Sequence, residues 1–262
     1  MPTAEFTTIQ ATADGAVGHL TLDRPEKLNP LGTTTLLELV AAARWFDEQP
    51  GVKAVVVSGS GRSFSAGADL ASFGDPAANQ GLTVREAADA GRLMAEAIEA
   101  MSAVTVAAIH GHCIGGGVVL AAACDLRVAA EDTYFSIPEV DLGIPLAWGG
   151  IPRLVREIGP ALTRELVLTC RPFTATEAQA FGFLNRVVPA EQVRATAEEL
   201  AGGLSTKSRL TLTATKRHVN AVLETMSGAT GSWSDADGLV TALHDPESRA
   251  AGADYLTRVR GD

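Results

Sequence analysis

The stretch that decides the fold of this chain is HGHCIGGG, residues 110–117, which directly follows the apolar run Val104–Ile109. A short apolar run rich in valine and isoleucine is typical of a buried strand. Three consecutive glycines after such a strand allow a tight turn and a close approach of the backbone to another group. We therefore predict a strand, a glycine-rich turn and a helix that begins near Gly116.

A second stretch of this kind, SAGADL at residues 65–70, lies about forty-five residues earlier and follows the apolar run Ala54–Val57. In a parallel sheet, the loops after both strands would meet at the carboxyl edge. The Gly116 amide would lie at a helix start, where it has no partner within the helix and adds the positive end of the dipole. We expect the amides of Ala66 and Gly116 to converge as an oxyanion hole. Either loop alone is better explained by an ordinary glycine turn, because such turns are common, whereas the two loops together are more specific.

The rest of the chain predicts an α/β fold. Asp14-Gly15 separates two strand-like runs, which indicates a hairpin, and Thr33 can begin a helix that ends near Phe46. Strands alternate with helices in the first two-thirds, which favours a largely parallel sheet with right-handed crossovers. The last third is predicted to be mostly helical and to pack on the first part or on a neighbouring subunit. The predicted helices there are 151–158, 161–169, 176–180, 191–200, 206–225 and 247–259.

The two glycine loops together resemble the enoyl-CoA hydratase/isomerase (crotonase) superfamily. The resemblance continues through further stretches and covers nearly the whole chain. These stretches are RPEKLN at 24–29, CDLR at 124–127, FSIPEVDLGI at 135–144 and AFGFLNRVVP at 180–189.

The resemblance implies a crotonase (ClpP-like) spiral of ββα units in residues 1–190 and a helical C-terminal region in residues 191–262, together one functional domain. It implies that the C-terminal region builds trimers, which pair into hexamers in many members. The implied ligand is an acyl-CoA thioester, with no metal and no cofactor beyond the coenzyme A of the substrate. Its carbonyl oxygen would accept hydrogen bonds from the amides of Ala66 and Gly116. Contacts to coenzyme A are implied for Lys27, Ala68, Asp69 and Leu70.

The resemblance also points to a catalytic carboxylate. Family hydratases place two glutamates around the substrate, and the matching positions here are Val119 and Glu139. Addition of water needs one group to deprotonate water and another to manage the proton at C2. A single glutamate can instead move one proton from C2 to C4, and an apolar wall such as Val119 would raise its pKa.

We therefore predict Δ3,Δ2-enoyl-CoA isomerisation by Glu139, with Val119 beside the substrate. Enoyl-CoA hydration and thioester hydrolysis are the alternatives within the family, and a non-catalytic CoA-binding protein is the alternative from another class. A serine peptidase with Ser65 as nucleophile and His112 as base lacks an evident acid, and we discount it. Trp148, Gly149 and Gly150 are expected to shape the acyl pocket, although the sequence does not place them.

Composition excludes several other classes. The formal net charge is −10 without a block of basic residues, which argues against nucleic-acid binding. No apolar run is long enough to span a bilayer, and Met1–Gln10 has no features of a secretory signal. Cys113, Cys124 and Cys170 lack metal-ligand spacing and favour reduced thiols. We therefore expect a cytoplasmic protein that binds neither nucleic acid nor membranes.

Overall fold

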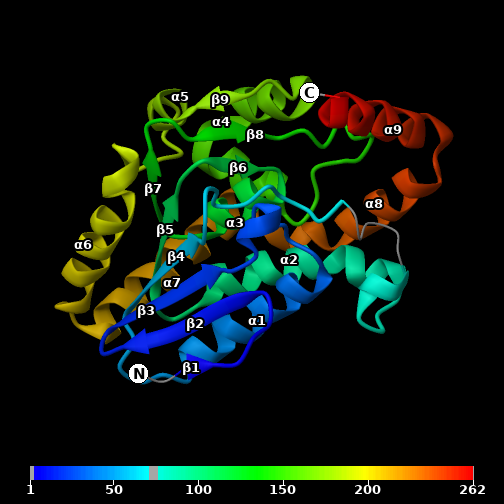
Figure 1. Cartoon of the computed structure of the whole chain (residues 1–262). Coiled ribbons are helices and arrows are strands. Elements are labelled where there is room, and N and C mark those ends of the chain that lie inside the picture. Colours follow the sequence, from blue (N-terminus) through cyan, green and yellow to red (C-terminus); the bar gives the residue numbers. More distant parts are fainter. Residues whose placement is uncertain (1–2, 71–75, 262) are drawn as a thin grey trace.

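The strands form two sheets in a computed structural model that describes residues 3–70 and 76–261 (Figure 1). The larger sheet has an antiparallel hairpin at one side, and from β3 onward its neighbouring strands are parallel. In spatial order it contains β1 (Thr3–Ala4), β2 (Ile9–Asp14), β3 (Val17–Leu22), β4 (Ala54–Gly59), β5 (Val104–Ile109), β7 (Leu126–Ala130) and β10 (Arg186–Val188). The smaller sheet contains β6 (His112–Ile114), β8 (Tyr134–Ser136) and β9 (Phe173–Thr174).

Helices surround the larger sheet (Figure 1). In chain order they are α1 (Thr33–Asp47), α2 (Val84–Ala100), α3 (Gly116–Ala123), α4 (Gly150–Thr169), α5 (Ala175–Ala180), α6 (Val193–Ser205), α7 (Arg209–Ser227), α8 (Asp235–His244) and α9 (Pro246–Gly261). Helix α2 begins at a capping box, in which the side chain of Thr83 accepts from the Glu86 amide and Glu86 reaches back to Thr83. Helix α4 bends at Gly159, whose φ is 78°, immediately before Pro160. Within the described residues, no helix is long and apolar enough to cross a membrane.

The two glycine loops lie against each other because β4 and β5 are parallel neighbours. Backbone hydrogen bonds join the loops directly: the Ser65 amide donates to the His112 carbonyl at 3.0 Å, and the Ile114 amide donates to the Ser65 carbonyl at 3.1 Å. A second short bridge pairs Leu31 with Ala68. Three segments distant in sequence are therefore fixed at one edge of the sheet.

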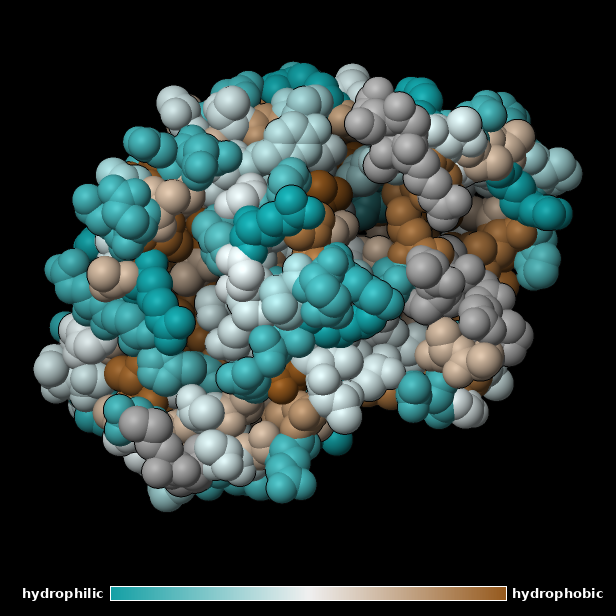
Figure 2. Space-filling model, in the orientation of Figure 1, coloured by the Kyte–Doolittle hydropathy of each residue, from teal (hydrophilic) through white to brown (hydrophobic). Residues whose placement is uncertain are grey.

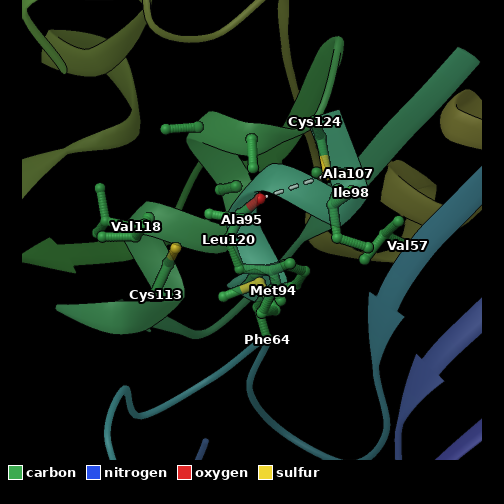
Figure 3. Packing of buried hydrophobic residues seen from close by; sticks show 14 of the residues in the cluster. Val57, Phe64, Met94, Ala95, Ile98, Ala107, Cys113, Val118, Leu120 and Cys124 are labelled. Carbon is green, nitrogen blue, oxygen red and sulfur yellow. Dashed lines mark hydrogen bonds between the residues drawn. The ribbon is translucent and has the colours of Figure 1, made fainter. Parts of the chain in front are cut away.

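The main core holds α3 in place (Figure 3). Every residue of this helix is buried, and Figure 3 shows Val118 and Leu120 among side chains from the surrounding elements, with Val57 from β4 and Met94 from α2 in the same cluster. Cys124 closes the helix end with a sulfur contact of 3.5 Å to the Leu120 carbonyl. A helix packed on all sides has little freedom to rotate or slide, so the position of its first amide is fixed.

The opposite face of the sheet has its own small core, where Ala197 and Ala201 of α6 pack on strand residues such as Val106 and Val128. Helix α7 packs on α4, α8 packs on α2, and α9 packs on α8. The prediction that the helical last third packs on the first part is therefore confirmed within this chain. Packing on a neighbouring subunit, and with it the trimer, stays a prediction.

Most predicted elements are present, but α8 was missed. Its sequence DADGLVTALH contains Gly238 near the middle, which weakens a helix by about 1 kcal/mol relative to alanine. Tertiary packing stabilises it: Ala236, Leu239 and Ala242 are buried, and the helix packs on α2. The short strands β6, β8 and β9 also escaped prediction, because two- and three-residue strands carry too little periodicity to detect.

Candidate active site

A small cavity of about 20 Å³ lies at the start of α3. Ala68, Gly116, Val119, Glu139 and Trp148 line it, together with the segment 144–147 and Leu239 of α8. The structure thus brings together the two glycine loops, the carboxylate and the valine that the sequence singled out. Among the lining residues in the described part of the chain, Glu139 is the only acid.

The Gly116 amide is available for a ligand. Gly116 is the first residue of α3 and follows Gly115, whose φ of 48° turns the chain into the helix. Within the described residues, this amide donates to no acceptor. It therefore offers a donor at the positive end of a buried helix.

The Ala66 amide is not available, so this part of the predicted oxyanion hole is wrong. It donates to the Leu28 carbonyl at 2.8 Å. On either side of Ala68, the Gly67 carbonyl accepts from the Leu31 amide at 2.7 Å, and the Asp69 amide donates to the Leu31 carbonyl at 3.2 Å. This one-sided pairing leaves the Ala68 amide directed away from residue 31, and within the described part of the chain it has no acceptor.

Ala68 therefore takes the place that the sequence assigned to Ala66. It lines the cavity, and the adjoining Gly67 lies so near α3 that a Cβ there would be 3.4 Å from the Gly116 nitrogen. Gly67 has a φ of 86°, which reverses the chain between the two alanines. The sequence could not show which of the two alanine amides faces the cavity, because the direction of each amide depends on hydrogen bonds to residues 28–31.

Glu139 faces the cavity from the loop after β8. Its side chain is 8% exposed, and within the described residues its Oε2 atom has no hydrogen-bond partner. Burial raises the pKa of this carboxyl to about 7, because the charged form loses hydration. A Cβ on Gly115 would collide with Oε1, so the carboxylate lies directly against the glycine turn. The main chain is fixed by a hydrogen bond of 2.9 Å from the Ile144 amide to the Glu139 carbonyl.

Val119 lies one turn into α3 and is 1% exposed. A Cβ on Gly150 would be 2.9 Å from one of its methyl groups, so the valine is packed between α4 and the cavity. As far as the described residues show, the cavity therefore has one carboxylate, and Val119 gives it an aliphatic wall. Such a wall disfavours the charged form of Glu139 and leaves the interior weakly hydrated.

Trp148 closes the cavity from the start of α4. A Cβ on Gly116 would collide with the outer edge of its indole, and a Cβ on Gly91 of α2 would collide with the inner atoms of the ring system. The indole therefore lies between two helices, each of which presents a glycine to it. The sequence marked Trp148 as a pocket residue, but the partners Gly91 and Gly116 emerge only from the packing.

Replacing Gly91 with Ala is expected to destabilise the protein by about 1–3 kcal/mol, because the added methyl group overlaps a buried indole that has no room to move. The gain in helix propensity, about 1 kcal/mol, offsets part of this cost. Urea unfolding followed by circular dichroism measures the change. Gly202→Ala in α6 is the matched control, since a Cβ there meets no atom within 4 Å. Equal stability of the two variants would contradict the packing of Trp148.

Of the residues predicted to contact coenzyme A, Ala68 lines the cavity, whereas Lys27, Asp69 and Leu70 do not. Lys27 is exposed in a short turn, and Asp69 forms an ion pair of 3.3 Å with Arg24. Leu70 lines an outer cleft of about 300 Å³ between the 142–144 segment and helices α8 and α9. Figure 2 shows hydrophobic surface in the hollow beside α8 and α9. Ile144 lines both this cleft and the inner cavity, so the two are adjacent.

The serine peptidase arrangement is not formed. The Ser65 hydroxyl donates to the Asn29 carbonyl at 2.8 Å and accepts from the Gly67 amide at 3.1 Å. His112 Nδ1 lies 3.1 Å from the hydroxyl of Ser63, whose side chain is fully buried. Both serines therefore support the loops that position the cavity.

Comparisons with known proteins identify the family and the relatives of this chain. A family model described as "Enoyl-CoA hydratase/isomerase" matches residues 12–258. A "Probable enoyl-CoA hydratase echA8" of Mycobacterium bovis is 36% identical over 219 residues, which cover 84% of this chain and 83% of that protein. A peroxisomal "Delta(3,5)-Delta(2,4)-dienoyl-CoA isomerase" of Arabidopsis thaliana is 35% identical over 218 residues, which cover 79% of this chain and 78% of that protein. The crystal structure of an enoyl-CoA hydratase from Mycobacterium avium subsp. paratuberculosis superposes with a TM-score of 0.86 at 24% identity, covering 97% of each chain.

Proposed function

The chain belongs to the enoyl-CoA hydratase/isomerase family, has the crotonase fold and is therefore an enzyme of acyl-CoA substrates. Within this family, we propose that it isomerises 3-enoyl-CoA to 2-enoyl-CoA. The observation that carries this proposal is the single buried carboxylate, Glu139, in a cavity whose other lining residues, within the described ranges 3–70 and 76–261, are not acidic. A shift of one proton along the substrate needs one group that is first a base and then an acid.

The proposed mechanism uses the two unpaired amides and Glu139. The thioester carbonyl oxygen accepts hydrogen bonds from the amides of Ala68 and Gly116. Glu139 removes a proton from C2, and the electron pair of that C–H bond moves into the C1–C2 bond, giving a dienolate whose negative charge lies on the thioester oxygen. The protonated Glu139 then returns the same proton to C4. The charge on oxygen re-forms the carbonyl, and the double bond ends between C2 and C3.

The electrostatics support both halves of this reaction. Two preorganised amides stabilise the charge that develops on oxygen, an effect that typically contributes about 3–4 kcal/mol per donor. A carboxyl with a pKa of about 7 exchanges its proton readily near neutral pH, so it can serve as base and acid in one turnover. The aliphatic wall at Val119 leaves a water molecule without a second partner beside the dienolate.

Hydration of 2-enoyl-CoA is the second candidate. The names of relatives favour it, since the Mycobacterium bovis protein is named a probable enoyl-CoA hydratase. The residues favour isomerisation, because Val119 occupies the position where a second acid would hold the attacking water. Hydration needs a second acid at position 119 and isomerisation does not, so one substitution at this position can separate the two reactions.

Replacing Val119 with Glu is expected to create or raise hydratase activity by about tenfold or more, because a second carboxylate would then hold and deprotonate water. The assay follows loss of the conjugated thioester absorbance of crotonyl-CoA. Val119→Gln is the matched control, since it adds similar bulk without a base. Equal rates of hydration by both variants would contradict the claim that hydration needs a carboxylate at position 119.

The proposed function itself is tested by incubating the purified protein with a 3-enoyl-CoA and following the appearance of the 2-enoyl thioester. Formation of 2-enoyl-CoA without 3-hydroxyacyl-CoA is the expected result. Release of free coenzyme A would identify thioester hydrolysis, and unchanged substrate that nevertheless binds would identify a non-catalytic CoA-binding protein. Either outcome would contradict the proposal.

We further propose that Lys27, Asp69 and Leu70 contact the coenzyme A moiety, with Leu70 doing so at the outer cleft, and that residues 191–262 support a homotrimer or a hexamer. Leu70 beside Ile144 supports the first point, because it joins the outer cleft to the cavity. Exposed apolar side chains on α7, such as Leu210 and Met226, support the second. Light scattering of the purified chain measures the assembly.

A further inference from the structure

Two cavities adjoin Trp148. The first is the reaction cavity of about 20 Å³, which contains Glu139 and the Gly116 amide. The second has a volume of about 50 Å³ and runs along α1 and α2, where Leu31, Leu36 and Ala88 line it. Both cavities share Ala68, Trp148 and Leu239 as lining residues. These three side chains therefore form the partition between the two spaces.

Trp148 is the largest part of this partition and is held firmly. Its φ of 61° lies in the left-handed region, which is unfavourable for a bulky residue and persists only where the surroundings enforce it. Arg153 donates to the Gly149 carbonyl at 3.1 Å, and the Gly149 amide donates to Asp235 of α8 at 2.9 Å. The loop around the tryptophan is thus tied to two helices.

Arg153 also connects this loop to the core. Arg153 is fully buried and forms an ion pair of 2.5 Å with Glu99 of α2, which also pairs with Arg156. A buried guanidinium with fixed partners cannot rotate away without leaving a charge unpaired. Together with the indole contacts to Gly91 and Gly116, this network fixes the ring over the first amide of α3.

We propose that Trp148 limits the length of the acyl chain by closing the passage from the reaction cavity into the second cavity. This inference rests on the proposed acyl-CoA function and names the substrate class: short acyl chains. The reaction cavity has room for about one or two water-sized groups, since one such group needs about 10–15 Å³. A longer chain would have to continue past the indole into the space along α1 and α2, where Leu31, Leu36 and Ala88 provide apolar surface beside the polar Thr33, Asp69 and Asn79.

The direct test compares binding of saturated acyl-CoA thioesters, butyryl-CoA and decanoyl-CoA, to wild type and to Trp148→Ala by titration calorimetry. Wild type is expected to bind butyryl-CoA at least as tightly as decanoyl-CoA. Removal of the indole joins the two cavities, so the affinity for decanoyl-CoA is expected to rise about tenfold relative to butyryl-CoA, as burial of two more methylene groups would give. Turnover of six-carbon and twelve-carbon 3-enoyl-CoA should shift in the same direction.

Trp233→Ala is the matched control, because Trp233 is 61% exposed and lines neither cavity. It should keep the wild-type ratio of affinities. Trp148→Phe is the second variant should the alanine variant not fold, and a shift of about threefold towards decanoyl-CoA is expected from its smaller ring. A folded Trp148 variant with the wild-type ratio, or a wild type that already prefers decanoyl-CoA, would overturn the inference.

Failure of the proposed reaction would look different. Saturated thioesters cannot isomerise, so their binding ratio reports the partition whether or not Glu139 performs the reaction. Absence of isomerisation together with a shifted binding ratio would reject the reaction and keep the role of Trp148. Isomerisation together with an unshifted binding ratio would keep the proposed reaction and reject the role of Trp148.

Discussion

Replacing Glu139 with Gln is expected to lower kcat for 3-enoyl-CoA isomerisation by about a thousandfold, within the range that general acid–base groups contribute. Gln keeps the size of the side chain but can neither accept the C2 proton nor return it to C4. Because the oxyanion donors are backbone amides, they remain in place, and substrate binding should change little. The measurement is steady-state kinetics on a 3-enoyl-CoA, with binding followed separately.

Asp141→Asn is the matched control for this prediction. It makes the same carboxyl-to-amide change in the same loop, at an exposed position two residues away. Its kcat should stay within about twofold of wild type, as expected for a surface substitution. A Glu139→Gln variant as active as Asp141→Asn would refute the proposed role of Glu139.

The pH profile gives an independent check on the same group. Glu139 must be ionised to remove the first proton, so kcat/KM should fall as pH decreases through about 7, the pKa to which burial raises this carboxyl. An unperturbed glutamate would instead keep the enzyme active down to about pH 4–5. A profile with its acid limb in that lower range would show that Glu139 is solvated when the enzyme works.

Glu139→Gln is also expected to stabilise the folded protein by about 3 kcal/mol at alkaline pH. Folding raises the pKa of Glu139 from 4.5 to about 7, so the folded state holds its proton more tightly than the unfolded state. At about 1.4 kcal/mol per pKa unit, this proton contributes stability that is fully present below about pH 4.5 and is lost as pH rises through about 7. Gln carries no such charge and does not incur the loss.

Urea unfolding at about pH 5 and pH 8 measures this effect. The free energies of unfolding of wild type and Glu139→Gln should be close at the lower pH and should separate at the higher pH, with the variant more stable. Asp141→Asn again serves as control and should show no such separation. A wild type that gains stability relative to Glu139→Gln between these pH values would contradict the burial of the charge.

The hydrophobic pattern and the turn residues predicted much of the architecture from local sequence. The strand Val104–Ile109 has the predicted bounds, α1 lies within a residue or two of its predicted ends, and Asp14-Gly15 lies at the predicted hairpin. These elements could be predicted because periodicity, capping residues and turn residues are local properties. Elements held by tertiary contacts, such as α8, could not.

Some features of the site likewise follow from local sequence, and others follow only from tertiary contacts. The sequence by itself determined that a glycine turn follows a buried strand, that Gly116 begins a helix, and that Glu139 has no second glutamate at position 119. The tertiary structure alone decided that Ala68, and not Ala66, directs its amide to the cavity, because hydrogen bonds to residues 28–31 set the direction of each amide. It also decided that Trp148 lies over Gly116, because that contact depends on how α2, α3 and α4 pack. Local sequence fixes which groups are present, whereas the direction of an amide or a ring depends on partners far away in the chain.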